Sequence, residues 1–549
     1  MAPRGAHPPH VQTEPVVHRG PDGAGERAVG LPWASVSLGV RRLAIVGARE
    51  VPVPFHEDGI TIAFNGEIYN WRALRSELPG PWRTECDVEV VARAWRRWGV
   101  RCLDRFEGMF AMVLVDETTG QVLVARDRAG EKPLYYARAN DAWHFASEVK
   151  ALGVELVEDV CDELDALEYD CTDATPFRGV LALPPGHFML LDGSEPTISK
   201  WWSLPEPEPC SPDDVPALLD ELTELVRTAV VERARADVPV AVLASGGLDS
   251  AIIQAVARKE RLYTVDFNGE TGMRGTNLVS FGRADALEVL PRLAYHLDTP
   301  ATWTSVALWF LAAAISRSEC KVVLSGEGAD EIFGGYSRYK MLAHIDALRR
   351  DAWLEDYRPL GEYIVGTDDD VLVRLLDRSC GAHRATIEAL VDAYAFGPTL
   401  VRRAMALDWH TTMQVLLRMI DRTMMAHGLE GRCPFLSHHV IRAAARLPDE
   451  WLASGAGTKV ALREIAHRLG VPKQIVESKR KHGLPIPWNA WFPEAARAGR
   501  GGFDRSHFAQ VMRSAWRSAF WPARAQAGHP TRSVRVAQAR VRRSRPQAM

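Results

Sequence analysis

The sequence predicts a two-domain α/β protein, with a layered, sheet-rich N-terminal domain followed by a domain built on a doubly wound parallel sheet. Three observations support this fold class. The chain has 549 residues, too many for one hydrophobic core. Short β-type runs dominate the first 200 residues, whereas strands alternate with helical segments after residue 215. A Pro- and Glu-rich stretch at 205–212 separates the two patterns.

The N-terminal domain is expected over residues 1–200. Turn residues separate its β-type runs, and a 3.6-residue periodicity is clear only at Val88–Trp98, where we expect a helix. The predicted strands are Ser35–Leu38, Ile60–Phe64, Met109–Val115, Gln121–Ala125, Leu134–Ala137 and His187–Leu191.

Residues 201–214 form the expected linker, because Pro and Glu there suit neither regular element. The second domain is expected over 215–500, and residues 501–549 form an Arg-rich C-terminal extension to which we assign no function. The predicted elements are an amphipathic helix, two strands and a long helical half, at Val215–Ala229, Val240–Ala244, Leu262–Phe267 and Tyr336–Leu469.

Composition excludes several classes of protein. With 47% hydrophobic and 25% charged residues and a net charge of −4, nothing suggests nucleic acid as a partner. The longest apolar stretch, Ala307–Ile315, is too short for a bilayer span, and no apolar signal follows Met1. Eight cysteines without a Cys-x-x-Cys pair argue against a zinc site and suit a reducing cytoplasm, where we expect the protein.

The first chemical motif follows the apolar run Val238–Ala244. Ser245-Gly246-Gly247 makes a turn, and Leu248-Asp249-Ser250 opens a helical segment. A Gly-rich turn at a helix N-terminus offers free backbone N–H groups to phosphate oxygens. Asp249 beside phosphates requires a cation, so Mg²⁺ is implied. An ordinary Gly-rich turn is the alternative.

A second strand, Val322–Leu324, runs into Ser325-Gly326-Glu327, and Asp330 follows in the same loop. Because ligands of parallel sheets bind beyond the carboxyl ends of the strands, one crevice could hold both loops. Asp249 and Asp330 would then share a Mg²⁺ bound to ATP, and Glu327 would remain for proton transfer. The alternative makes these acids N-cap and first-turn residues. The expected ATP and pyrophosphate contacts are Leu243, Ser245, Gly246, Gly247, Leu248, Asp249, Ser250, Ser325 and Gly326.

These two motifs resemble the pyrophosphatase loop and the second ATP motif of the glutamine-dependent asparagine synthetases. The resemblance extends over roughly residues 16–490. Further matches are His18–Gly23, Arg42–Ile45, Phe64–Asn70, Ala125–Arg128, Lys132–Tyr136 and Glu430–Leu436. It implies an N-terminal-nucleophile (Ntn) hydrolase-like αββα domain and an ATP-pyrophosphatase domain that adenylates a carboxylate and forms an amide. ATP, Mg²⁺ and small-molecule substrates are implied, and a homodimer is compatible with it.

The resemblance also implies a glutamine pocket. Arg42 would hold the glutamine carboxylate and Glu67 with Asp87 its ammonium, while Asn65 and Gly66 would form an oxyanion hole. The alternative makes Asn65-Gly66 an ordinary hairpin turn, which this dipeptide favours.

The family's nucleophile is not found at its expected place. Family members begin Met-Cys-Gly-Ile, whereas position 2 here is Ala2 and the earliest cysteine is Cys86. His18 also stands about thirty residues too early for the family. Either the recorded start lies downstream of the true one, or glutaminase activity has been lost. We expect the chain as written to have no glutaminase activity.

Three basic residues match family positions. Lys481 would stabilise the leaving pyrophosphate, with a solvated loop as the alternative. Lys459 and Arg463 share a helix face and match a basic pair, although a surface role is equally compatible with their spacing.

Departures from the family pattern bear on the substrate. The short region 268–275, Thr299 and Ser437 all differ from what the family carries, and they put aspartate in doubt more than ATP. Three hypotheses follow: an aspartate-dependent amide ligase, a β-lactam-forming or similar synthetase with another amine, and a catalytically silent regulatory homologue.

Overall fold

The computed structural model describes residues 1–3, 10–47, 51–159, 175–259, 261–267, 275–350, 371–373, 384–455, 457–478, 487–491, 505–521 and 540–543. Lys481 and most of the short region 268–275 lie outside them. Among the described residues, no helix is both long and apolar enough to cross a bilayer.

The N-terminal domain is built on a six-stranded antiparallel sheet in the order β12-β11-β7-β6-β5-β4. Alternate residues of β6 face opposite layers, as strand geometry requires: Met112 and Leu114 pack under helices, and Val113 and Val115 under a second sheet layer. The strands are β4 (Phe55–Glu57), β5 (Ile60–Ile68), β6 (Gly108–Asp116), β7 (Gln121–Arg126), β11 (His187–Leu191) and β12 (Thr197–Lys200), and the helices are α1 (Trp71–Glu77), α2 (Asp87–Trp98) and α3 (Cys102–Arg105).

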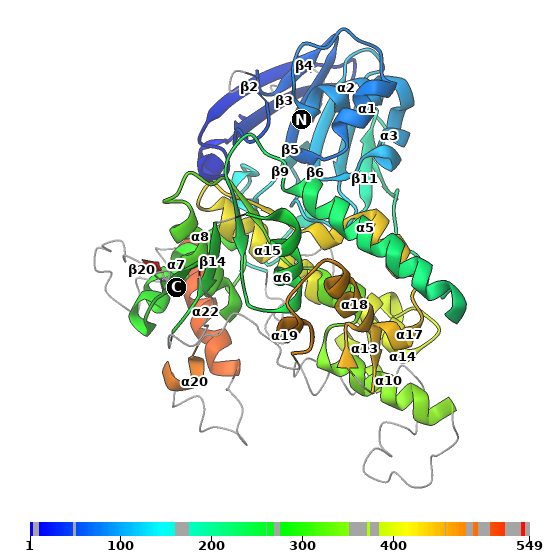
Figure 1. Cartoon of the computed structure of the whole chain (residues 1–549). Coiled ribbons are helices and arrows are strands. Elements are labelled where there is room, and N and C mark those ends of the chain that lie inside the picture. Colours follow the sequence, from blue (N-terminus) through cyan, green and yellow to red (C-terminus); the bar gives the residue numbers. More distant parts are fainter. Residues whose placement is uncertain are drawn as a thin grey trace.

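Two three-stranded sheets, β1-β3-β2 and β10-β8-β9, form the second sheet layer. The outer face of β8 and β10 packs against the second domain, where Phe177 contacts Trp516 with ring centroids 5.5 Å apart. These strands are β1 (Ala2–Pro3), β2 (Gly23–Gly30), β3 (Ala34–Arg42), β8 (Tyr135–Ala139), β9 (Ala142–Ala146) and β10 (Val180–Ala182). The predicted layered sheet domain is confirmed, and it occupies the blue and cyan half of Figure 1.

The second domain contains a six-stranded sheet in the order β17-β16-β13-β14-β15-β20, parallel except for β20. From β13 the chain moves outward through β14 to β15, then crosses back to β16 and on to β17. Since crossovers are right-handed, the reversal places helices on both faces, and this confirms the doubly wound sheet. The strands are β13 (Val240–Leu243), β14 (Leu262–Val265), β15 (Thr276–Ser280), β16 (Val322–Leu324), β17 (Glu430–Arg432) and β20 (Arg540–Arg543).

Helices surround this sheet and fill most of the C-terminal half (Figure 1). They are α5 (Val215–Arg233), α6 (Leu248–Ala257), α7 (Arg283–Leu297), α8 (Trp303–Ile315), α9 (Ala329–Phe333), α10 (Ser337–Arg350), α13 (Arg384–Tyr394), α14 (Leu400–His410), α15 (Thr412–Met425), α16 (His438–Ala444), α17 (Asp449–Leu452), α18 (Val460–Arg468), α19 (Lys473–Val476), α20 (Trp488–Trp491) and α22 (Arg505–Phe520). The stretch expected to be almost wholly helical also contains β17 and the two-residue strands β18 (Ala453–Ser454) and β19 (Gly457–Thr458).

A buried ionic cluster joins the two domains. Glu148 forms ion pairs with Arg19 of its own domain and with Arg422 of α15, each at 3.0 Å. Arg422 also lies 3.1 Å from Asp298, which Lys150 contacts at 2.7 Å. Because these groups are nearly inaccessible to water, removing one of them would leave a buried charge without its partner.

Candidate active site

The reversal of strand order falls between β13 and β16, which are hydrogen-bonded neighbours in the sheet. The two predicted loops, Ser245–Ser250 and Ser325–Asp330, leave the carboxyl ends of these two strands. In open parallel sheets this position is where ligands bind. The two loops therefore lie side by side at one edge of the sheet, as expected.

The Ser245–Ser250 loop has the conformation of an anion cradle. Gly246 adopts a φ of +75°, which a residue with a side chain rarely takes, and Gly247 caps α6 with extended backbone. The hydroxyls of Ser245 and Ser250 lie 3.2 Å apart, and the Gly247 N–H donates to Ser245 Oγ at 3.3 Å. These contacts hold the loop together at the N-terminus of α6.

The two loops touch at Gly326. A Cβ on Gly326 would lie 2.9 Å from the Cβ of Asp249, so only glycine permits this approach. Ser325 is anchored from the far side, since its N–H donates to the carbonyl of Arg432 on β17 at 3.0 Å. The close approach brings the acidic residues of both loops together.

Asp249 and Asp330 meet around a single cation, the ammonium of Lys459. Its Nζ lies 2.7 Å from both carboxylate oxygens of Asp249 and 2.7 Å from Oδ1 of Asp330. Despite burial, the two carboxylates raise the pKa of Lys459. Two converging carboxylates next to a phosphate cradle are ligands that suit Mg²⁺, so the residues present fit the predicted metal.

The remaining predicted residues of this site have other contacts. Arg463 does not join Lys459 at the aspartates: its Nε donates to the Thr458 carbonyl at 3.1 Å and its Nη1 to the Ser478 carbonyl at 3.1 Å. Glu327 is half-buried in the second loop. Its neighbour Glu331 is buried, and burial together with Asp330 raises the pKa of Glu331 to about 8.

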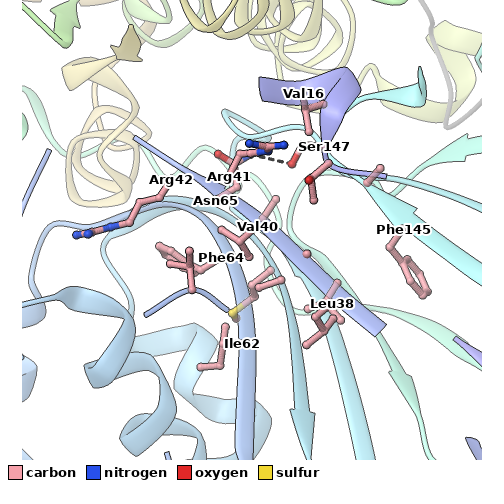
Figure 2. Close-up of a pocket in the computed structure, with 18 of the residues that line it drawn as sticks. Val16, Leu38, Val40, Arg41, Arg42, Ile62, Phe64, Asn65, Phe145 and Ser147 are labelled. Carbon is pink, nitrogen blue, oxygen red and sulfur yellow. Dashed lines mark hydrogen bonds between the residues drawn. The ribbon is translucent and has the colours of Figure 1, made fainter. Parts of the chain in front are cut away.

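A second pocket lies in the N-terminal domain, between the two sheet layers (Figure 2). It has a volume of about 290 Å³ and an apolar wall that includes Leu38 and Ile62. All five predicted glutamine-binding residues line it: Arg42, Asn65, Gly66, Glu67 and Asp87. The prediction of a shared pocket for these residues agrees with their placement.

The hairpin alternative for Asn65-Gly66 is wrong. Both residues lie inside β5, where Asn65 pairs with Ala111 and Gly66 with Phe110 across to β6. Gly66 takes a φ of +146°, and a Cβ there would lie 2.0 Å from the Met109 carbonyl oxygen. Asn65 Nδ2 donates to Ser147 Oγ at 3.3 Å, as the dashed line in Figure 2 shows.

Two buried carboxyl groups dominate the electrostatics of this pocket. Burial raises the pKa of Asp87 to about 6 and, with Asp87 adding repulsion, that of Glu67 well above its usual value. Arg432 of the second domain lies 3.6 Å from Glu67. Cys86 lies beside Arg42, with Sγ 3.7 Å from Nη2, yet burial raises the pKa of the Cys86 thiol to about 11.

Comparison with known proteins identifies the family. The asparagine synthase family model matches residues 221–526, more than half of the chain, and the glutamine amidotransferase domain model matches residues 9–202. The chain belongs to the asparagine synthetase family. It is therefore a ligase of an ATP-dependent family that combines a synthetase and a glutamine amidotransferase domain.

Relatives cover most of this asparagine synthetase homologue. Glutamine-hydrolyzing asparagine synthetase 1 of Bacillus subtilis is 28% identical, covering 87% of this chain and 83% of its own. A Mycobacterium tuberculosis protein named for the same activity is 31% identical over 86% of this chain and 83% of its own. Among solved structures, the glutamine phosphoribosylpyrophosphate amidotransferase of B. subtilis covers 42% of this chain and 56% of its own with 19% identity and a TM-score of 0.27, too low to bear on the fold.

The sequence alone is compatible with both a surface role and an active-site role for Lys459. The helix spacing that paired it with Arg463 could not separate them, because Lys459 stands before α18 with a left-handed φ of 55°. Its placement depends on β18 and β19, two-residue strands that no periodicity reveals.

Proposed function

We propose that this chain forms an amide from a carboxylate, L-aspartate by default, after activating the carboxylate with ATP. The observation that carries the proposal is the convergence of Asp249 and Asp330 on one cation at the switch point of the sheet. Two carboxylates that share one cation beside a Gly-rich turn are suited to bind a triphosphate with its counter-ion. The alternative, in which each acid only caps its own helix, does not explain why the two carboxylates converge.

The proposed reaction has two steps, adenylation of the carboxylate and formation of the amide. A substrate carboxylate oxygen attacks the α-phosphorus, the bond to the bridging oxygen of pyrophosphate breaks, and ammonia then displaces AMP from the acyl carbon. The Ser245–Ser250 loop would bind pyrophosphate, Asp249 and Asp330 would hold Mg²⁺, and Glu327 would accept the proton from the amine. Bound Mg²⁺ would neutralise charge on the phosphates. Lys481, outside the described residues, is assigned to the leaving pyrophosphate.

We infer that the amine is ammonia, either free or derived from glutamine, and that Cys86 is not the nucleophile of any glutamine hydrolysis. Glutamine hydrolysis needs a thiolate, and the pKa of about 11 keeps the Cys86 thiol in the pocket protonated at neutral pH. Arg42, Glu67 and Asp87 line the cavity with groups that match an amino-acid zwitterion, so glutamine binding is expected.

Pyrophosphate release from ATP tests the proposal. We expect release with Mg²⁺ and aspartate, and formation of asparagine when ammonium salt is also present. Release only with another carboxylate would support the β-lactam-type alternative. No release with any carboxylate would favour the silent homologue and contradict the proposal.

A further inference from the structure

Lys459 occupies the position at which a metal ion shared by Asp249 and Asp330 would be held. Its ammonium contacts three carboxylate oxygens, each at 2.7 Å. Carboxylate oxygens are also the ligands of hard divalent cations. An ammonium and a metal ion cannot fill the same space, so the two cations exclude each other at this site.

The surrounding backbone keeps the lysine there. Lys459 has a left-handed φ of 55° between β19 and α18, and its side chain is only 8% exposed. A Cβ on Gly335 would lie 2.2 Å from Lys459 Cε and 1.8 Å from Oδ1 of Asp330. Gly335 therefore leaves the space that the lysine stem and the carboxylate share, and the contact is not a loose surface pair.

The geometry points to Lys459 as a built-in counter-ion that closes the nucleotide-free site to free divalent cations, so that metal and nucleotide bind together. This inference rests on the proposed metal–nucleotide site. Phosphate oxygens add ligands that a free metal ion lacks, and they favour the divalent cation over a single ammonium. The displaced ammonium remains beside the Ser245–Ser250 loop, where its charge attracts the phosphates.

Binding of metal and of nucleotide is therefore coupled in the wild-type protein, and the coupling is reciprocal. Removing the ammonium should raise the affinity for the metal alone. It should raise the affinity much less when a nucleotide is present, because the phosphates then give the displaced ammonium another partner. The coupling should shrink accordingly in a variant without the lysine charge.

Electron paramagnetic resonance of Mn²⁺ can test this with the full chain, with and without a non-hydrolysable ATP analogue. Lys459→Gln should bind free Mn²⁺ about tenfold to a hundredfold more tightly than wild type, the value of a charge-assisted contact. Arg463→Gln is the matched control: it removes one positive charge nearby, but Arg463 donates to backbone carbonyls. Arg463→Gln should change the affinity for free Mn²⁺ by no more than about fivefold, because Arg463 does not contact the two aspartates.

The outcomes separate this inference from the proposed function. Suppose that wild type binds Mn²⁺ in the presence of the analogue, but that Lys459→Gln binds Mn²⁺ no more tightly than wild type in its absence. Only the counter-ion role of Lys459 is then overturned. If wild type binds no Mn²⁺ even with the analogue, the proposed metal–nucleotide site fails. Should Lys459→Gln not fold, equal Mn²⁺ affinity of wild type with and without the analogue would overturn the inference.

Discussion

Arg422→Met should destabilise the contact between the two domains more than any surface charge change. Arg422 is fully buried, and it pairs with Glu148 at 3.0 Å and Asp298 at 3.1 Å. Breaking a buried pair costs about 3–5 kcal/mol, because the carboxylates left behind lose their partner. Arg19 and Lys150 still contact Glu148, so the lower end, about 3 kcal/mol, is expected.

Urea unfolding followed by circular dichroism measures the loss. Because a chain of this length has a denaturant slope above about 3 kcal/mol/M, the midpoint should fall by up to about 1 M. Arg446→Met is the matched control, since Arg446 pairs with Glu221 at 2.8 Å on the surface, where both side chains are over 40% exposed. Such a pair contributes about 0–1 kcal/mol. Equal midpoints for the two variants would refute the argument from burial.

The same variant has a defined pH dependence. Although burial acts in the opposite direction, Lys150 and Arg422 hold the pKa of Glu148 well below its usual value. A carboxyl group with a depressed folded-state pKa stabilises the protein above its unfolded pKa, about 4.3, and that stability is lost as pH falls through the folded value. The advantage of wild type over Arg422→Met should therefore shrink as the pH falls below about 5, and it should go on shrinking towards the folded-state pKa. A constant difference across that range would contradict this.

Further predictions concern the two pockets. Asp249→Asn and Asp330→Asn should each lower ATP–pyrophosphate exchange at least about a hundredfold, because they remove proposed metal ligands; unchanged exchange would exclude the metal role. Gly326→Ala should lower exchange about tenfold to a hundredfold, since the new Cβ displaces Asp249, whereas Gly455→Ala, where a Cβ meets nothing within 4 Å, should not. Iodoacetamide should modify Cys86 slowly at pH 8 and faster towards pH 11, as followed by mass spectrometry; fast modification at pH 7 would mean a reactive thiolate.

Much of the fold could be predicted from residue patterns. His187–Leu191 was expected as a strand with the bounds it has, because its apolar run ends cleanly at turn residues. The amphipathic periodicity from Val215 predicted α5, which runs on to Arg233. Strand β17 could not be predicted, because Glu430-Gly431-Arg432 has no apolar alternation and pairs only in the folded sheet.

The candidate sites were predictable to different degrees. Asp249 and Asp330 could be placed together because strand order in a parallel sheet brings loop ends to one edge. The burial of Lys459 could not be predicted, since it depends on the left-handed turn before α18. Likewise, Asn65-Gly66 has the composition of a turn, and only pairing with β6 shows that β5 continues through it.

Strand β17 connects the two pockets physically. Glu430 lines the cavity of the N-terminal domain, and the Arg432 guanidinium lies 3.6 Å from Glu67 in that cavity. The Arg432 carbonyl meanwhile accepts the N–H of Ser325, which opens the second loop of the ATP site. A domain movement that separated β5 from β17 would break the buried Arg432–Glu67 pair and pull on the loop that carries Asp330. Three residues of backbone thus contact both sites, without a long chain of contacts between them.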